Sequence, residues 1–560
     1  MNSQLLFTRP AFWLFMLVVL AILSLLKKKT GMRNAFLFSA SIFFYWNTSA
    51  SFVFLLLFST TADWLIALAM SKSNSWKRKA WLVLSIVINL GLLGFFKYAY
   101  FFADASSALF GTTWEAIIPG ANWMNSNLGT SFRVDSILLP VGISFYTFQT
   151  LSYAIDVYRK DIEPVKSFRD FGCYVTFFPQ LVAGPIVRAK SFIPQLRAPY
   201  NLTQKEFKMG IWLILTGLIK KIILADYIAT NLVDRVFLNP TSYSGMEVVI
   251  GLYGYSLQVF ADFSGYSDIA IGVALIMGFR LAENFRSPYK ARNVGEFWER
   301  WHISLSTWLK DYLYIPMGGS RRSSYFTWIF SISVIAFIAK MLGVDGGINM
   351  GVLFLGMGLM LLIWSSGVMF PKWGLKVATY VNIMATMVIG GLWHGASWNF
   401  LLWGALNGAG LLLYKIVGKH LPWASRDKFW ARAIGVFTTF NFITFTRIWF
   451  RAGSGIGWET VPGNHNLLTE WFTANDLLYQ IYHHFFDIPA QAIARGHFIC
   501  ISLMILGFVV HLAPEKIKKN IIELFTSLKL ISVWAICAVV ALVLWKVQGA
   551  DPSPFIYFQF

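Results

Sequence analysis

The chain has 560 residues, of which 56% are hydrophobic and only 13% are charged, and its mean hydropathy is +0.57. Soluble domains carry about 25% charged residues, so this composition excludes an ordinary water-soluble protein. The net charge of +20 comes from short basic clusters between apolar runs, which argues against a nucleic-acid-binding face. We therefore predict an all-α, polytopic membrane protein that contacts membrane lipid and binds no nucleic acid.

The basic clusters predict the orientation. Lys27 to Lys29 follow the first apolar run, and the rule that cytoplasmic loops are positively charged then places the N-terminus outside. Segments of ~20 residues predict roughly 12–14 crossings within one domain, residues 1–560. The segments are residues 11–26, 33–46, 50–70, 82–103, 136–158, 210–235, 246–278, 325–343, 351–369, 376–392, 398–414, 430–450, 496–513 and 525–545.

Three stretches depart from simple crossings. Residues 171–186, FGCYVTFFPQLVAGPI, have basic flanks on both sides and are broken by prolines, so we predict a re-entrant loop. A short ordinary span is the alternative. Residues 280–322 are predicted to be cytoplasmic, and residues 452–495 to form the largest outer loop. We find no internal repeat of the kind common in secondary transporters.

The cytoplasmic stretch contains GEFWERWHISLSTWLKDYLYIPMGG. At helical spacing, Trp298, Trp301 and Trp308 fall on one apolar stripe, which predicts an amphipathic helix over roughly 296–313. Its charge keeps it from facing lipid across the bilayer, and its tryptophans are typical of an anchor at the interface. We therefore expect it to lie along the inner surface or to lead into a polar cavity.

Glu299, His302 and Ser306 share one flank of this predicted helix, and Arg300 points the opposite way. Arg300 is a candidate to attract a phosphate-rich donor at the inner mouth, with the positive-inside rule as the alternative explanation for its charge. One interpretation is that His302 belongs to a reaction chamber. The alternative is a surface helix whose histidine only bonds Glu299.

A second histidine lies in GGLWHGASWNF, a glycine-rich break between two apolar runs. Ionisable groups at membrane depth usually face a cavity or a polar partner, and histidine acts as a general base near neutral pH. We expect His394, with Trp393 and Asn399, to line a chamber. The alternative is an idle histidine in a turn at the outer surface.

A third polar island, ADFSGYSDIAIG, lies within the apolar run 246–278. Asp262 and Asp268 have no reason to face lipid, so they line a chamber, bind a proton or cation, or cap a helix break at Gly265. Neither aspartate is expected to be catalytic. The three cysteines are far apart and form no CxxC pair, so we predict neither a metal site nor a disulfide.

Several motifs in order resemble the membrane-bound O-acyltransferase family over nearly the whole chain. They are SFYTFQTLSYAIDVYR, FFPQLVAGPIVR, FADFSGYSDIAIG, FWERWHISLSTWLKDYLYIPMGG, GGLWHGASWNF and the terminal PFIYFQF. Within the family they look most like the membrane subunit of alginate and exopolysaccharide O-acetyltransferases. The resemblance implies a tunnel through a thin part of the membrane, and its two family histidines map onto His394 and His302.

The resemblance also implies transfer of an acetyl group from a cytoplasmic thioester, acetyl-CoA in the simplest case, toward an extracytoplasmic polysaccharide. A separate esterase-like partner, the bacterial inner membrane and no bound cofactor are part of that expectation. His394 would be the general base, with a covalent acyl-histidine as the alternative. His302, steadied by Glu299 or Ser306, would orient the donor or stabilise the oxyanion.

Two rival functions remain open at this stage. One is the branch of the same family that transfers D-alanine from a carrier-protein thioester to teichoic acid. The other is a polymer or solute transporter with Asp262 and Asp268 as its ion site, which the two histidine motifs and the missing repeats disfavour.

Overall fold

The structure is a computed structural model that describes residues 5–110, 137–342, 349–418, 428–454, 467–488, 490–547 and 555. Within these ranges all regular structure is helical, which confirms the all-α prediction. The helices of the first half are α1 (Pro10–Leu26), α2 (Thr30–Ser49), α3 (Phe52–Ser71), α4 (Ser75–Phe110), α6 (Ile143–Arg159), α7 (Phe168–Thr176), α8 (Phe178–Leu181), α9 (Ala189–Arg197), α10 (Gln204–Ile219), η1 (Lys220–Asp226), η2 (Ala229–Val233), α11 (Asp234–Leu238), η3 (Pro240–Ser242) and α12 (Gly245–Ile276).

The second half continues from η4, and η1, η2 and η5 are π-helical turns, whereas η3 and η4 are 3₁₀ turns. Its helices are η4 (Pro288–Lys290), α13 (Val294–Arg300), α14 (Ile303–Leu309), η5 (Lys310–Tyr314), α15 (Tyr325–Met341), α16 (Met350–Met369), α17 (Pro371–His394), α18 (Trp398–Val417), α19 (Phe429–Ala452), α20 (Leu467–His483), α21 (Ala490–Gly496), α22 (Phe498–Leu512), α23 (Glu515–Ser527) and α24 (Leu530–Val547).

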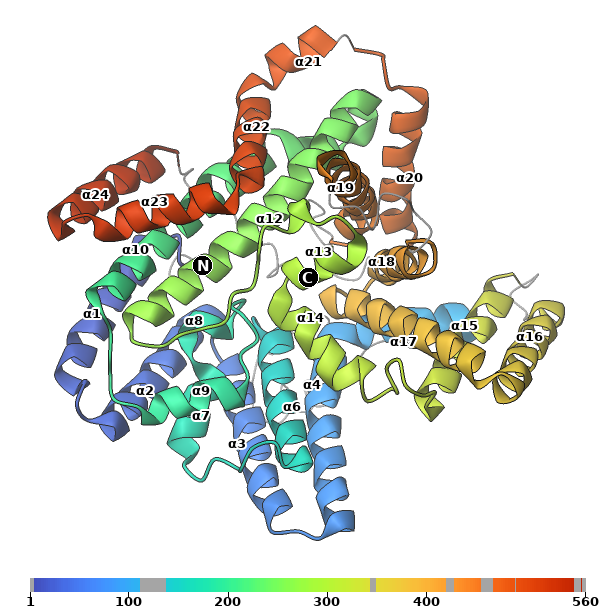
Figure 1. The fold of residues 1–560 in the computed structure, drawn as a ribbon, viewed down its shortest axis with the longest axis horizontal. Helices are drawn as coiled ribbons and strands as arrows, with labels where there is room; N and C mark the ends of the chain where they lie inside the picture. Colours follow the sequence, from blue (N-terminus) through green and yellow to red (C-terminus); the bar gives the residue numbers. More distant parts are fainter. Residues whose placement is uncertain are drawn as a thin grey trace, which may run out of the picture.

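The long helix α12 crosses the centre of the molecule with α10 against it (Figure 1). In this view α2 to α4 and α6 to α9 lie below α12, α17 and α18 lie below and to its right, and α22 to α24 lie on its opposite side. Helices α15 and α16 pack on each other at the edge of the molecule, beyond α17. The centre of the molecule is therefore enclosed by helices from distant parts of the sequence.

The structure has fewer uninterrupted crossings than the sequence predicts. In the described ranges, six helical segments are long and apolar enough to cross a membrane, or seven if the pair α22–α23, bent by 93°, is one span. Three shorter apolar helices add to them: Pro10–Leu26, Tyr325–Lys340 and Met350–Ser365. The expectation of roughly 12–14 spans was higher because it treated each apolar run as one straight helix of ~20 residues. Residues 210–235, for example, are divided among α10, η1, η2 and α11.

The predicted break within residues 171–186 is present. The segment forms the end of α7, the four-residue α8 and an irregular stretch, and every residue from 171 to 187 is buried. A nine-residue helix such as α7 rises only about 14 Å, which is too short to cross a membrane. Irregular backbone at membrane depth is tolerated where protein shields it, as here. The predicted re-entrant path remains a prediction, because no membrane is present to define the two sides.

Close packing of α10 on α12 depends on glycine. A Cβ on Gly217 would lie 2.6 Å from the carbonyl oxygen of Gly265, so only glycine fits at this crossing. Small residues at helix crossings let backbones approach closely within a membrane. The crossing brings the π-helical turn η1, which follows α10 directly, against the middle of α12.

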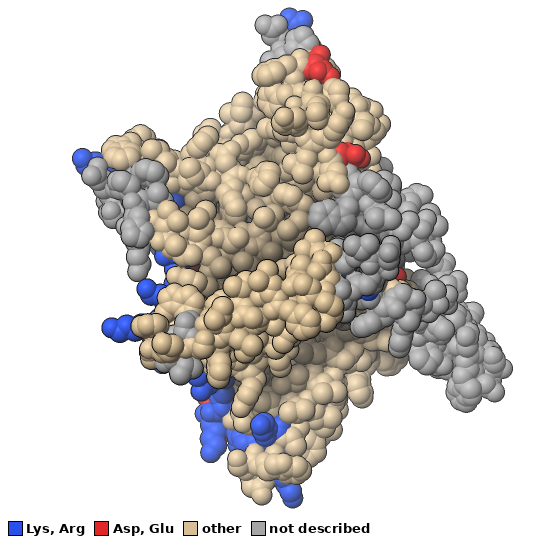
Figure 2. Space-filling view, turned by 90° about the vertical axis from the view of Figure 1, so that its right-hand side faces the viewer, with Lys and Arg blue, Asp and Glu red and all other residues tan. Residues whose placement is uncertain are grey.

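The loops predicted to be cytoplasmic contact one another. Arg78, after the α3–α4 turn, donates to the carbonyl of Tyr158, and Arg159 donates to the carbonyl of Asp311. Arg188 forms an ion pair with Asp311 at 3.4 Å. Figure 2 shows Lys and Arg gathered along the lower and left edge of one face, while most of that face is neither acidic nor basic. This distribution agrees with the positive-inside assignment.

The loops predicted to be outside also meet. The backbone N–H of Gly245, which begins α12, donates to the carbonyl of His484, and Arg451 pairs with Asp234 at 3.1 Å. The predicted outer loop 452–495 therefore contains the helix α20, which packs on α12 and α19. Residues 455–466 and 489 of that loop lie outside the described residues, as do residues 111–134 of a second outer loop, which the sequence predicts over 104–134.

Candidate active site

The helix predicted over 296–313 is interrupted at His302. Helix α13 ends at Arg300, α14 begins at Ile303, and a π-helical turn, η5, follows. His302 has φ 43° and ψ 55°, in the left-handed region that side chains other than glycine rarely adopt. The break turns the imidazole inward, where it is 0% exposed. The prediction of one helix over 296–313 is wrong at this point, because hydrophobic periodicity assumes a continuous helix and does not detect a break in the backbone.

The hydrogen bonds of Asn284 indicate which ring nitrogen of His302 carries the proton. The backbone N–H and the hydroxyl of Ser304 both lie within bonding distance of Asn284 Oδ1, at 3.2 and 2.9 Å, so this atom is the amide oxygen. His302 Nδ1 lies 3.2 Å from the same oxygen, and it can bond an acceptor only by donating. The proton of neutral His302 is thereby assigned to Nδ1, and Nε2 carries a lone pair.

The two expected partners of His302 and the donor-binding candidate Arg300 are placed differently. Glu299 is exposed, and it lies on the far side of the backbone break. Ser306 donates to the carbonyl of Trp301 instead of to the imidazole. Arg300 forms an ion pair with Glu296 at 2.8 Å. The prediction that Glu299 or Ser306 steadies His302 is therefore wrong, since Asn284 does so.

The Arg300 pair has an electrostatic role of its own. Burial acts to raise the pKa of Glu296, but hydrogen bonds from the Arg292 backbone N–H and from the Arg300 and Arg292 side chains lower it below its ordinary value. Arg300 thus stabilises the start of the polar segment, and we assign it no part in donor binding.

His394 is the last residue of α17 and is 2% exposed. A Cβ on Gly391 would collide with the carbonyl oxygen of Phe400, and this close approach of α17 to α18 folds the chain back at His394. The imidazole is enclosed by aromatic rings: its centroid lies 5.1 Å from Trp403 and 5.3 Å from Phe450. The alternative of an idle surface histidine is therefore wrong.

Trp393 brings the two histidines together. Its ring centroid lies 5.9 Å from that of His302 and 5.0 Å from that of His394. Counting of crossings had placed His302 near the inside and His394 toward the outside. The break before α14 and the tight α17–α18 turn remove that separation, so both imidazoles border one aromatic enclosure.

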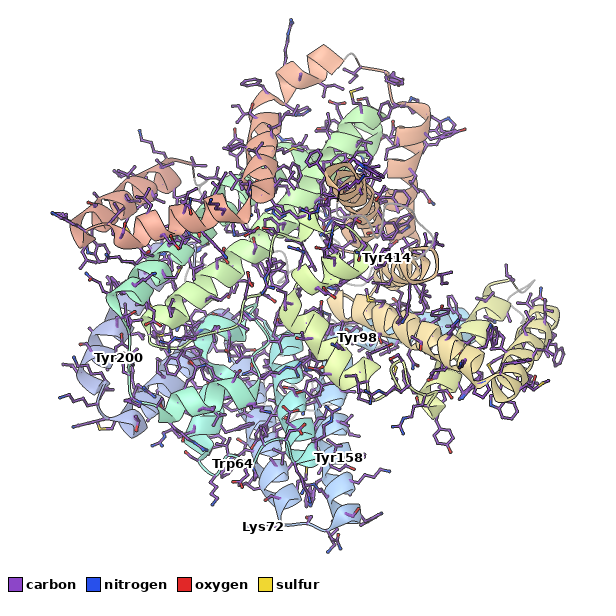
Figure 3. All side chains as sticks on the ribbon, in the orientation of Figure 1. Trp64, Lys72, Tyr98, Tyr158, Tyr200 and Tyr414 are labelled. Atoms are coloured by element: carbon purple, nitrogen blue, oxygen red, sulfur yellow. The ribbon has the colours of Figure 1, made fainter. Side chains whose placement is uncertain are left out.

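Lys97 of α4 fixes the end of α17. Its ammonium donates to the carbonyls of Trp393 at 2.7 Å and His394 at 3.2 Å, and to the hydroxyl of Ser144 at 3.3 Å. A cation at the C-terminus of a helix satisfies the last carbonyls and complements the helix dipole. One residue further along α4, the hydroxyl of Tyr98 donates to the carbonyl of Leu392, as its position beside α17 in Figure 3 illustrates.

One cavity borders the enclosure, and a second lies near it. The smaller, of about 30 Å³, is lined by Lys97, Ser144, Trp393 and His394, and it has room for a water or a hydroxyl group. The larger, of about 670 Å³, lies between α14, η5, α17 and α18. Its lining includes Trp298, Thr386, Tyr414 and two lysines, Lys310 and Lys415. The ring of Trp298 lies 5.8 Å from Trp403, which itself contacts His394.

The aspartates of the segment ADFSGYSDIAIG do not lie with the histidines but at the contact between α12 and η1. Asp262 pairs with Lys221 at 2.5 Å, and Asp268 pairs with Lys220 at 2.6 Å. Both lysines come from η1, and α12 runs unbroken through Gly265. The alternative of a helix break at Gly265 is therefore wrong. The aspartates join α12 to η1, and we assign them no contact with a substrate.

Asn399 is fully buried in the first turn of α18, where its backbone N–H donates to the hydroxyl of Ser397. Its place next to the α17–α18 turn keeps it a candidate for the chamber. The terminal motif PFIYFQF lies outside the described residues except for Phe555, whose ring lies 5.6 Å from Phe263. Phe263 in turn packs edge-on against His302 at 4.5 Å.

Sequence reasoning missed Lys97, Ser144 and Asn284. Lys97 had a usable signal, since it is the one charged residue within the apolar run GLLGFFKYAYFFA that precedes Asp104. Such residues mark functional sites by default. Asn284 and Ser144 had none, because their role depends on contacts across the fold. Among the described residues, no three His, Cys, Asp or Glu side chains gather in a way that would hold a metal ion.

The sequence profile of the membrane-bound O-acyltransferase family matches residues 165–373. A peptidoglycan O-acetyltransferase of Helicobacter pylori is 31% identical over 443 residues, which cover 74% of this chain and 70% of the relative. The chain belongs to the membrane-bound O-acyltransferase family. The resemblance predicted from the motifs is thus confirmed.

Other members of the family are similar over shorter stretches. A probable alginate O-acetylase, AlgI, of Pseudomonas syringae pv. tomato is 36% identical over 390 residues, 69% of this chain and 62% of the relative. A teichoic acid D-alanyltransferase of Bacillus subtilis is 26% identical over 318 residues, 54% of this chain and 67% of the relative. The chain thus aligns with less than two thirds of the alginate relative's length. His302 lies within the span of the family profile, and His394 lies beyond it.

Proposed function

We propose that this chain transfers an acetyl group from a cytoplasmic thioester, acetyl-CoA in the simplest case, to a hydroxyl on the other side of the membrane. Family membership and two relatives whose names specify O-acetyl transfer support the proposal. The names of those relatives also favour a polysaccharide as the final acceptor. An esterase-like partner outside the bacterial inner membrane completes the pathway in this proposal.

The observation that carries the proposal is the pair of buried histidines joined by Trp393, with a small cavity at His394 and a larger one that begins at Trp298. The larger cavity has two lysines, which attract a phosphate-bearing donor. The smaller one holds His394 beside Ser144 and suits a hydroxyl acceptor. Donor and acceptor would then approach the histidines through different cavities.

In the proposed reaction, His394 removes the proton of the acceptor hydroxyl as its oxygen attacks the thioester carbonyl carbon. A base in this position contributes typically ~10²–10⁴-fold to the rate. The tetrahedral intermediate collapses as the C–S bond breaks, and the leaving thiolate takes the proton from His394. The products are an ester and a thiol.

The hydrogen bonds of His302 revise the role expected for it. With its proton held on Nδ1 by Asn284, neutral His302 presents a lone pair at Nε2, which accepts a hydrogen bond and donates none. It is therefore suited to orient a donor or acceptor N–H or O–H, and unsuited to stabilise an oxyanion. Orienting a substrate is the role we assign to it.

A second candidate function is D-alanyl transfer from a carrier-protein thioester, because a teichoic acid D-alanyltransferase is 26% identical over 54% of the chain. The same two histidines would serve it. A carrier protein that copurifies with the chain and supports turnover would favour this candidate over the acetyl donor.

The test uses proteoliposomes that contain the wild type, His394→Gln, His302→Gln or His484→Gln, supplied with labelled acetyl-CoA on the cytoplasmic face. His484 is a surface histidine paired with Asp487 and serves as the matched control. We expect label on acetate or on an added acceptor from the wild type and the control, and at least a ~10²-fold loss in His394→Gln. Equal turnover in all four proteins would overturn the histidine assignment.

A further inference from the structure

Arg447 is a buried cation in the wall of the enclosure. It lies on α19 and is 2% exposed. Its guanidinium carbon lies 4.8 Å above the ring of Trp301 and 5.9 Å from that of Phe450, and Nη2 lies 3.4 Å from the hydroxyl of Tyr289. Aromatic faces attract a cation, but they leave its hydrogen-bond donors unused.

The next arginine on α19 has the carboxylate partner that Arg447 lacks within the described ranges. Arg451, one turn later, pairs with the carboxylate of Asp234 at 3.1 Å. Among the described residues Arg447 has no carboxylate partner, and its buried Nε has no hydrogen-bond acceptor. Burying a charge is costly unless it is paired, so an uncompensated guanidinium indicates a negative charge that is supplied from elsewhere.

The neighbours of Arg447 indicate where in the protein that negative charge would lie. Trp301 immediately precedes His302, and Phe450 lies 5.3 Å from His394. Besides His302, the basic side chains whose electrostatic influence reaches His394 are Lys97 and Arg447. The ammonium of Lys97 is committed to two carbonyls and the Ser144 hydroxyl. Of these two cations, Arg447 alone retains a buried donor for a transient ligand.

We propose that Arg447 is a catalytic residue that binds the oxyanion formed on the acyl group during transfer, an inference that rests on the proposed function. When the acceptor oxygen bonds to the thioester carbonyl carbon, the electron pair of the C=O bond moves to oxygen, and His394 holds the acceptor's proton. Arg447 Nε–H donates to that oxygen. The electron pair then re-forms C=O, the C–S bond breaks, and the thiolate receives the proton from His394.

The arrangement assigns the oxyanion to Arg447 and leaves His302 to orient a substrate. Neutral His302 has a lone pair at Nε2, so it repels an oxyanion, whereas a guanidinium is always protonated. A donor fixed before the reaction begins stabilises charge in the transition state without reorganisation. Interactions of this kind raise kcat and leave ground-state binding of the donor unchanged.

The experiment compares wild type, His394→Gln, Arg447→Gln, Arg447→Lys and Tyr289→Phe in the proteoliposome assay, with KM for acetyl-CoA, kcat and the unfolding midpoint measured for each. We expect kcat to fall ~10²–10³-fold in Arg447→Gln, as when one oxyanion donor is removed, with KM within about twofold. Arg447→Lys keeps the charge and should recover part of kcat. Tyr289→Phe removes the neighbouring hydroxyl but not the guanidinium and should keep kcat within about threefold.

Three outcomes would overturn the inference. The first is a raised KM with kcat intact, which would mean ground-state binding of an anionic donor. The second is a kcat loss that merely follows the loss of folded protein, and the third is equal kcat in Arg447→Gln and wild type. If turnover does not depend on His394, the proposed function itself fails. Dependence on His394 without dependence on Arg447 defeats only this inference.

Discussion

The two buried polar regions of this apolar protein differ in how their charges are balanced. Between α12 and η1, Lys220 faces Asp268, and Lys221 faces both Asp226, at 2.8 Å, and Asp262. Around His394, the cations Lys97 and Arg447 have aromatic rings and backbone carbonyls as neighbours, and the described part of the chain gives them no carboxylate. In the first region each lysine has a carboxylate partner, and in the second neither cation has one among the residues that the structure describes.

This difference in charge balance distinguishes a region that stabilises the fold from one that can take part in a reaction. A charge that is matched at every contact holds two elements in register, and its removal leaves an isolated partner buried. A buried charge without a match is available to a substrate or a transition state, which is why such groups gather at functional sites. The type of residue alone does not distinguish the two cases. Substitutions in either region test this comparison.

The largest effect is expected from Lys221→Met, which leaves Asp226 and Asp262 buried without their shared cation. Breaking a buried pair in this way costs about 3–5 kcal/mol of the free energy of unfolding. Thermal unfolding in detergent would measure it, and the triple variant that also carries Asp226→Asn and Asp262→Asn should recover most of the loss. An unchanged midpoint in Lys221→Met would mean that these pairs do not hold α12 to η1.

A smaller effect, on catalysis and not on folding, is expected from Lys97→Met. Without the ammonium at the end of α17, His394 loses its fixed position, and displacements of about 1 Å can cost ~10²-fold in rate. We expect kcat to fall about 10- to 100-fold with KM for the donor unchanged.

Lys208 provides the matched control for Lys97. It is also a buried lysine whose ammonium bonds two backbone carbonyls, those of Thr526 and Leu528, but it joins α10 to the end of α23. Lys208→Met should lower the unfolding midpoint and keep kcat per folded molecule. Equal losses of kcat in both variants would contradict a specific role of Lys97 at His394.

The smallest effect is expected from Glu299→Gln. Because Glu299 is exposed and lies beyond the break at His302, the free energy of unfolding should change by less than about 0.5 kcal/mol. Turnover in the proteoliposome assay should match the wild type. A clear loss of turnover would mean that Glu299 does contribute to the chamber, as the helical periodicity predicts.

Local patterns predicted the elements well. The apolar runs are helical throughout the described residues, the prolines of 171–186 mark a real break, and the basic loops meet at one end. Both histidines were identified, because ionisable residues stand out against an apolar background.

Partners across the fold could not be predicted in the same way. Lys97 reaches His394 over 297 residues of sequence, and Asn284 fixes His302 from outside the helix in which periodicity had placed it. Asp262 and Asp268 have the residue types expected of a chamber, and only contacts with Lys221 and Lys220 show that they belong elsewhere. Such pairings depend on which helices pack together, which a single sequence does not reveal.

The left-handed backbone at His302 has a consequence for engineering. A residue other than glycine in this conformation costs roughly 1–2 kcal/mol, so His302→Gly relieves strain that His302→Ala retains. Both variants also remove the buried imidazole and its bond to Asn284, so each leaves a cavity that offsets any relief of strain. The difference between their unfolding midpoints, rather than either midpoint alone, therefore isolates the backbone strain that holds the imidazole of His302 in place.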